Sequence, residues 1–252
     1  MNHNISMKIK ILFLGSHLKS YHCFRYLIEN FSNIEIVGIV PHINQPPIRF
    51  DQDIVAYAKA KKIPILELKD LAGITCDLGI SLMFDAKLPP EIVDLPKRGF
   101  VNIHLAPLPQ LRGVNGIYHA IRLAREKKYS RYAVTLHYMD ATLDTGPIID
   151  KMTLPLFEDD TAQSLHVRAC DKVYELFVRN IGRLIKNRTS LKSKSQKGIG
   201  MYYFKKDLAH EIDINWPAEK IYDNVRALTF PGKPKPFISV GPYRIYLSLE
   251  NI

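Results

Sequence analysis

Two polar side chains in one short apolar segment have the types and the spacing that chemistry needs. Asn102 and His104 lie two residues apart in the segment 100–104, whose apolar and β-branched neighbours predict a strand. Because side chains alternate between the two faces of a strand, both should point to the same side. A neutral imidazole can take a proton from an attacking amine, and an amide N–H can stabilise a developing oxyanion. The pair therefore suits acyl transfer.

A second polar group follows in the segment 135–149, where His137, Asp140 and Asp144 lie beside a Thr-Gly-Pro turn. A carboxylate aimed at His104 would fix the orientation of the imidazole and could bind a water that relays a proton. The spacing does not say which aspartate does this, because an aspartate before Thr-Gly is also ordinary turn chemistry. No third ligand accompanies the histidines at a spacing typical of metal sites, so we expect no metal.

The elements that must position these groups alternate between strands and helices. Strands are expected at 8–15, 34–41, 65–66, 78–84, 100–104, 133–139 and 148–156, a loop at 43–50, and helices at 21–30, 53–61, 114–126 and 161–185. This alternation predicts an α/β fold, a Rossmann-like open and mostly parallel sheet with helices on both faces. Ligands bind such sheets beyond the carboxyl ends of the strands. The first turn lacks the G-x-G-x-x-G spacing, which argues against a dinucleotide-dependent oxidoreductase.

The chain is long enough for one good-sized core and a small appendage. We expect a catalytic domain over 1–190 and a small C-terminal subdomain over 191–252 that serves substrate binding or dimerisation. In that subdomain the sequence predicts a helix near 218–227 and a β-hairpin from 237–240 and 243–249, joined by Gly-Pro.

Composition narrows the partners and the compartment. An excess of 35 Lys and Arg over 25 Asp and Glu gives a net charge of +10, which favours anionic partners. A basic run from Arg183 to Lys206 contains few aromatic residues, so we interpret it as a solvated segment and expect no nucleic acid. The 3 cysteines form no C-x-x-C pair, which indicates a reducing compartment. Without an apolar run for a membrane span or a convincing signal peptide, we expect a cytoplasmic protein with no membrane partner.

The order of the motifs resembles a known family. N-x-H at 102–104, P-L-P-x-x-R-G at 107–113, T-x-H-x-M-D at 135–140 and D-T-G-P-I at 144–148 are together similar to the signature of the folate-dependent formyltransferases. These include methionyl-tRNA, glycinamide ribonucleotide and sugar-nucleotide enzymes. The resemblance covers residues 8–156 in detail. One departure is that the family often has a serine after the N-x-H pair, where Leu105, Ala106 and Pro107 stand here.

The resemblance implies roles for the residues singled out above. Asn102, His104 and Asp144 take the places of the family's catalytic residues, which selects Asp144 over Asp140. The formyl donor would be 10-formyltetrahydrofolate. Its pterin would lie in a pocket formed by the loop after the strand before N-x-H and by residues just before the catalytic aspartate. The implied folate contacts are Ser81, Met83, Phe84, Leu88, His137 and Asp140.

The stretch 211–247 is similar to the segment that follows the catalytic domain in sugar N-formyltransferases. The acceptor implied is the amino group of a nucleotide-linked, dTDP-type amino-deoxyhexose for a bacterial surface glycan such as O-antigen. Aromatic faces could stack on a base or sugar and cations could pair with a pyrophosphate, although many of these side chains could simply pack the tail. The candidate substrate contacts are Arg112, Trp216, Tyr222, Arg226, Phe230 and Lys233.

Two other functions remain open at this point. A methionyl-tRNA formyltransferase-like enzyme with a truncated tail fits the positive charge, but we expect that class to have a longer C-terminal domain. A formyltetrahydrofolate deformylase would use a similar site and release formate without an amine. An exposed edge of the predicted hairpin also suggests a homodimer.

Overall fold

A computed structural model describes residues 8–15, 17–41, 51–84, 86–198 and 200–249. The loop expected at 43–50 and residue 16 of the first turn lie outside these described residues. The chain forms two compact units. The first contains segments of 1–104, 135–151 and 173–196, and the second contains 105–134, 152–172 and 197–252. Because the units interleave along the chain, they do not coincide with the expected division at residue 190, which stays a prediction about function.

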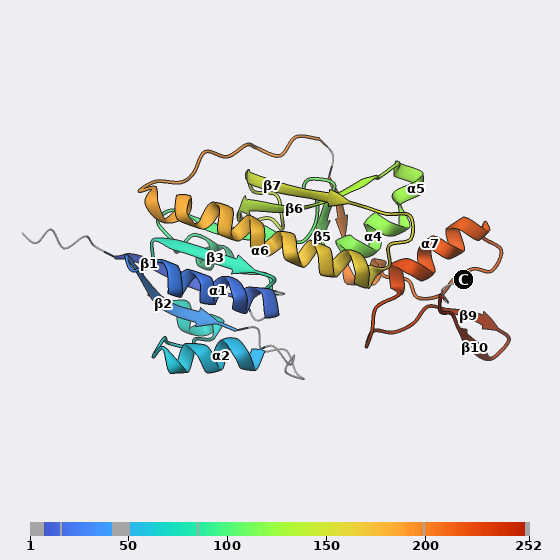
Figure 1. The fold of residues 1–252 in the computed structure, drawn as a ribbon, viewed down its shortest axis with the longest axis horizontal. Helices are drawn as coiled ribbons and strands as arrows, with labels where there is room; N and C mark the ends of the chain where they lie inside the picture. The colour runs from blue at the N-terminus through green and yellow to red at the C-terminus, as the bar shows by residue number, and fades with distance from the viewer. Residues whose placement is uncertain (1–7, 16, 42–50, 85, 199, 250–252) are drawn as a thin grey trace, which may run out of the picture. The chain divides into compact units, whose positions relative to one another are not determined.

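A six-stranded sheet in the order β2-β1-β3-β4-β6-β7 forms the framework of the fold (Figure 1). Its strands are β1 (Ile9–Leu14), β2 (Ile34–Val40), β3 (Leu78–Leu82), β4 (Phe100–His104), β6 (Arg131–Tyr138) and β7 (Ile148–Pro155). The strands β2, β1, β3 and β4 pair in parallel, and β6 pairs with β4 in the antiparallel sense. The prediction of a mostly parallel α/β sheet is therefore confirmed, with the strands within one or two residues of the expected bounds.

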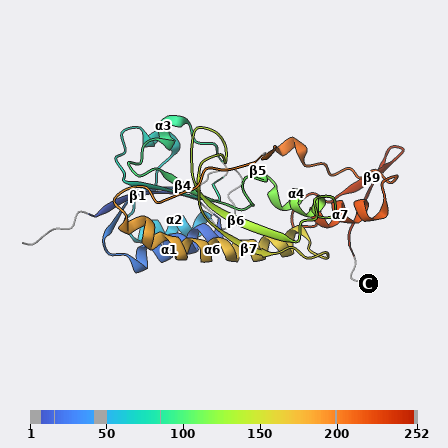
Figure 2. The ribbon, with the colours of Figure 1, turned by 90° about the horizontal axis from the view of Figure 1, so that it is seen from above.

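Helices cover both faces of this sheet, as expected for strands that are apolar on both sides. The helices of the framework are α1 (Leu18–Asn30), α2 (Asp51–Ala60), η1 (Leu68–Leu71), α3 (Pro90–Val93) and α6 (Ala162–Lys186). On one face, Phe13 of β1 contacts Phe24 of α1, which in turn contacts Tyr57 of α2. On the other face, Leu12 and Leu14 pack with residues of η1 and α3. Figure 2 shows α1 and α6 on one side of the sheet and α3 on the other.

Two local expectations were wrong. The single helix expected at 114–126 is divided into α4 (Gly116–Arg122) and α5 (Ala124–Lys127), because Leu123 adopts φ −97° and ψ 0°, outside the helical region. The short strand expected at 65–66 amounts to a single bridge between Ile65 and Ile39 of β2.

The second unit has small sheets of its own. Strand β5 (Leu111–Gly113) pairs in parallel with β8 (Met201–Tyr203), and both are too short to leave a period in the sequence. Gly113 is required there, because a Cβ on it would lie 2.2 Å from the carbonyl oxygen of Tyr203. Further along are η2 (Lys205–Asp207), helix α7 (Ala218–Leu228), and the hairpin of β9 (Phe237–Val240) and β10 (Tyr243–Tyr246). The helix and the hairpin were expected, but β10 ends three residues earlier than predicted. In the part of the chain described, no helix is long and apolar enough to cross a membrane.

Candidate active site

The register of three strands brings the polar residues of the first unit into one row. Ser81 of β3 is the partner of Asn102 on β4, and Asn102 is the partner of His137 on β6. The neighbours of Asn102 in the chain, Val101 and Ile103, line a small cavity on the opposite face of the sheet, together with residues of α6. The alternation predicted for this strand thus directs Val101 and Ile103 toward α6, and Asn102 and His104 toward the opposite face of the sheet, where the candidate site lies.

Asp144 is the aspartate that lies beside His104. Its Oδ1 is 3.6 Å from Nδ1 of His104 and 3.7 Å from Nε2 of His137, and the residue is only 8% exposed. Asp140, in contrast, is exposed, and its Oδ1 accepts hydrogen bonds from the backbone N–H of Thr142 and the hydroxyl of Thr145, at 3.2 and 2.7 Å. The geometry therefore separates two aspartates that spacing alone left equivalent.

The turn that carries Asp144 depends on its sequence. The Asp140 side chain caps a local turn, as aspartates commonly do. Asp144 itself adopts a left-handed conformation with φ +56°, which is uncommon for a residue with a side chain. Position 146 requires a glycine, because a Cβ there would lie 1.9 Å from the carbonyl oxygen of Tyr138. The Asp-Thr-Gly-Pro sequence thus returns the chain closely along the end of β6, with the Tyr138 N–H bonded to the carbonyl of Pro147 at 3.0 Å.

His137 is buried in the row and orients Asn102. It is 1% exposed, with Nδ1 2.7 Å from the carbonyl oxygen of Tyr138 and Nε2 3.2 Å from Nδ2 of Asn102. Since the carbonyl can only accept and the amide nitrogen can only donate, Nδ1 carries the proton and Nε2 accepts. Burial lowers the pKa of His137 to about 4, so the ring is neutral near pH 7. Both ring nitrogens are thus bonded within the protein, and the expected contact of His137 with folate stays a prediction.

Comparison with known proteins identifies the family of the chain. A family model described as formyl transferase matches residues 57–181, which contain Asn102, His104 and Asp144. The chain belongs to the formyl transferase family. The resemblance drawn from the motifs, the fold class and the assignment as a formyl-transferring enzyme are confirmed.

Relatives of this formyl transferase carry several names. The methionyl-tRNA formyltransferase of Geobacillus sp. (strain WCH70) is 29% identical over 238 residues, which cover 87% of this chain and 71% of the relative. The crystal structure of an N-formyltransferase from Helicobacter canadensis, in complex with folinic acid and dTDP-3-aminofucose, has a TM-score of 0.75 and 25% identity, and the match covers 88% of this chain and 81% of that one. WlaRD, a sugar 3N-formyl transferase in the presence of dTDP and 5-N-formyl-THF, has a TM-score of 0.75 and 27% identity, with coverages of 88% and 80%.

The residues expected to form the folate pocket of the enzyme differ in their access to a ligand. Leu88 is 4% exposed inside an apolar cluster with Leu12, Leu14 and Phe100, and its expected contact with folate stays a prediction. Ser81 is 3% exposed but stands next to Asn102 in the row. Met83, at φ +52°, and Phe84 are half-buried and remain candidates for the pocket.

The expected substrate contacts lie in the second unit of the enzyme. Arg112 stacks on the ring of Tyr202 at 5.4 Å, and the ammonium of Lys220 lies 4.0 Å from the ring centre of Trp216. Phe230 meets the His166 ring edge-on at 5.3 Å. The expected contacts Arg112, Trp216 and Phe230 are half-buried, whereas Tyr222 and Lys233 are exposed. Aromatic and cationic groups are thus available in this unit, and their contact with a ligand stays a prediction.

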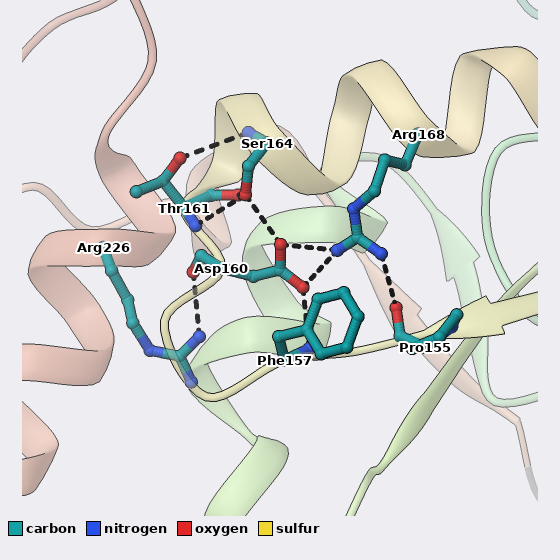
Figure 3. Close-up of polar contacts among 7 residues, drawn as sticks. All are labelled: Pro155, Phe157, Asp160, Thr161, Ser164, Arg168 and Arg226. Carbon is teal, nitrogen blue, oxygen red and sulfur yellow. Dashed lines mark hydrogen bonds and ion pairs between the residues drawn. The ribbon is translucent and has the colours of Figure 1, made fainter.

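Arg226 has an interior role instead of the expected contact with a pyrophosphate. It is 1% exposed, and its guanidinium donates to a carboxylate oxygen of Asp223 at 2.8 Å and to the carbonyls of Asp160 and Ile121 at 2.9 and 3.3 Å. Figure 3 shows the guanidinium directed at the Asp160 carbonyl, while the Asp160 carboxylate is bound by Arg168. The buried arginine therefore links α7 to the segment just before α6. Because its carbonyl partners lie far away in the chain, the sequence could not distinguish it from a ligand-binding cation.

Proposed function

We propose that this formyl transferase moves a formyl group from 10-formyltetrahydrofolate to the amino group of a nucleotide-linked, dTDP-type amino-deoxyhexose for surface glycan (O-antigen) biosynthesis. The observation that carries the proposal is the likeness to two solved structures, each matched over at least 80% of its length at 25% and 27% identity and named with a folate derivative and a dTDP compound. The proposal keeps the expected cytoplasmic location.

The row of polar residues gives each step a group with suitable chemistry. The amine of the acceptor attacks the formyl carbon, and the carbonyl electrons move to its oxygen. The amide of Asn102 donates to this oxyanion, with its orientation fixed by the neutral His137. His104 takes the proton that the amine loses and, once charged, is stabilised by Asp144 at 3.6 Å. As the oxyanion re-forms the carbonyl, the bond to the folate nitrogen breaks, that nitrogen takes the proton held by His104, and the formyl group remains on the acceptor amine.

Aromatic and cationic side chains of the second unit support the proposed acceptor, and its exposed hairpin supports the proposed assembly. Trp216 and Tyr222 offer faces for a base or sugar, and Arg112 and Lys233 offer cations for a pyrophosphate. The hairpin exposes Tyr243, Ile245 and Tyr246 at 72%, 49% and 61%, respectively. Apolar side chains on an unpaired strand edge favour pairing with a second copy, so we propose a homodimer through β10.

A methionyl-tRNA acceptor is the second candidate, because the curated relatives at up to 29% identity carry that name. The net charge of +10 would also favour a polyanionic acceptor. Turnover with initiator methionyl-tRNA that falls steeply with salt, together with no response to amino-sugar nucleotides, would establish this candidate in place of the first.

The experiment measures formyl transfer and formate release by mass spectrometry with 10-formyltetrahydrofolate and one of three additions: a set of dTDP-amino sugars, methionyl-tRNA, or no acceptor. We expect transfer to an amino sugar and little loss of formyl without one; formate release without an acceptor would indicate a deformylase. His104→Ala should lower turnover by about a hundredfold or more, since it removes the general base. His22→Ala, which removes an exposed histidine of α1, is the matched control. A His104→Ala enzyme with near wild-type turnover would refute the mechanism.

A further inference from the structure

A segment of the basic run lies along the turn that carries Asp144. Residues 191–196 form this segment, the strap. The backbone N–H of Leu191 donates to the hydroxyl of Tyr138, and Lys194 forms an antiparallel bridge with Ile148 through two hydrogen bonds of 2.8 Å. All of these residues belong to the first unit. The strap therefore follows the return of the chain from the end of β6 to the start of β7.

Gln196, at the end of the strap, joins both sides of the turn. Its side-chain Nε2 donates to the carbonyl oxygen of Asp144 and to the carbonyl oxygen of Gly146, each at 2.8 Å. Both partners are backbone acceptors, so the nitrogen of the amide must face them. One amide thus bridges the residues on either side of Thr145.

The turn needs such support. A residue with a side chain is disfavoured in the left-handed region, and Asp144 lies there with φ +56°. The two hydrogen bonds from Gln196 hold the carbonyls on either side of Thr145 and so oppose this strain. Their loss would let the carboxylate leave its place 3.6 Å from Nδ1 of His104.

We propose that Gln196 is a positioning residue for formyl transfer, which holds the carboxylate of Asp144 toward His104 by bonding the two carbonyls of the turn. The inference rests on the role given to Asp144 in the proposed function. Gln196 acts through the turn, whose carbonyls at Asp144 and Gly146 it bonds. Its removal should therefore lower kcat, and this effect should disappear in an enzyme that already lacks the Asp144 carboxylate.

Three substitutions of Gln196 separate the effect of hydrogen-bond donation from the effect of side-chain size. Gln196→Ala removes both bonds and should lower kcat by about tenfold, the rate change that corresponds to about 1.4 kcal/mol. Gln196→Glu keeps the shape but sets oxygens against the two carbonyls, so its kcat should fall further. Gln196→Lys restores donors at a similar reach and should stay within about threefold of the wild type. Ser195→Ala, at an exposed neighbour in the strap, is the control and should leave kcat unchanged.

A double-mutant cycle with Asp144→Asn completes the test, with thermal unfolding recorded for every variant. We expect Asp144→Asn alone to lose most of the turnover. Adding Gln196→Ala to that variant should lower kcat by less than about a further twofold. Wild-type kcat for Gln196→Ala, failure of Gln196→Lys to rescue, or fully additive losses would overturn the positioning role and leave the proposed function intact. Wild-type turnover for Asp144→Asn would overturn both. Should the glutamate variant not fold, the alanine and lysine variants still decide between these outcomes.

Discussion

Replacement of His119 by Phe should make the enzyme more resistant to acid. His119 lies on α4 in the second unit, is 0% exposed, and stacks on Tyr203 with ring centres 3.7 Å apart and planes 21° apart. Among the described residues, neither of its ring nitrogens has a hydrogen-bond partner. Burial, the largest cause, and the nearby charge of Arg122 lower the pKa of His119 to about 4.

The magnitude follows from the difference between the folded and unfolded states. In the unfolded chain a histidine has a pKa of about 6.5, so between that value and about 4 the unfolded state binds a proton that the folded state does not. Stability is therefore lost as the pH falls through this window, by about 1.4 kcal/mol per pH unit. Between pH 7 and pH 5 the loss due to His119 amounts to about 2 kcal/mol. Phe keeps the stack on Tyr203 and cannot titrate.

The assay is urea unfolding of the wild type and His119→Phe at pH 7 and pH 5. The difference in free energy of unfolding between the two proteins should grow by about 2 kcal/mol at the lower pH, in favour of the variant. Comparing the same pair at two pH values cancels any constant change in packing. His22→Phe, at an exposed position of α1, controls for the loss of an imidazole. An equal difference at both pH values would refute the reasoning, because it would mean that the folded protein binds the proton as readily as the unfolded chain.

Two further substitutions test the turn and the buried arginine. Gly146→Ala should lower kcat by about tenfold or more and lower the melting temperature, because its Cβ would lie 1.9 Å from the Tyr138 carbonyl; wild-type kinetics and melting would show that the turn can shift. Arg226→Met should destabilise the protein by about 3–5 kcal/mol in urea unfolding, because it leaves the buried Asp223 with fewer partners; an unchanged midpoint would show that the charge pair is dispensable.

The framework strands could be predicted because their residues are buried on both faces. Runs such as Ile9–Leu14 and Leu78–Leu82 are apolar and rich in β-branched residues, and nothing in their surroundings opposes that preference. The shared face of Asn102 and His104 followed from alternation alone. Patterns that depend on neighbours along the chain were thus sufficient for the sheet and for placing Asn102 and His104 on the same face of their strand.

Features that depend on distant partners could not be predicted. The burial of Leu88 and His137 gave no signal, because nothing local distinguishes a buried position from a ligand contact. Arg226 could not be distinguished from a surface cation, because the two carbonyls that it bonds, those of Asp160 and Ile121, lie 66 and 105 residues earlier in the chain. Gln196 gave no signal, because its partners lie about fifty residues earlier in the chain and are backbone atoms. No side-chain motif records a contact of that kind.

The burial of His137 has a consequence for the electrostatics of the row. The same oxygen of Asp144 lies 3.6 Å from one imidazole and 3.7 Å from another, so distance alone does not decide which histidine the carboxylate stabilises. Because burial keeps His137 neutral near pH 7, the negative charge of Asp144 is available to a proton on His104, the half-buried ring. In the proposed mechanism the buried histidine therefore supports transfer in two ways: its Nε2 accepts a hydrogen bond from the amide of Asn102, and its neutral ring does not compete with His104 for the carboxylate.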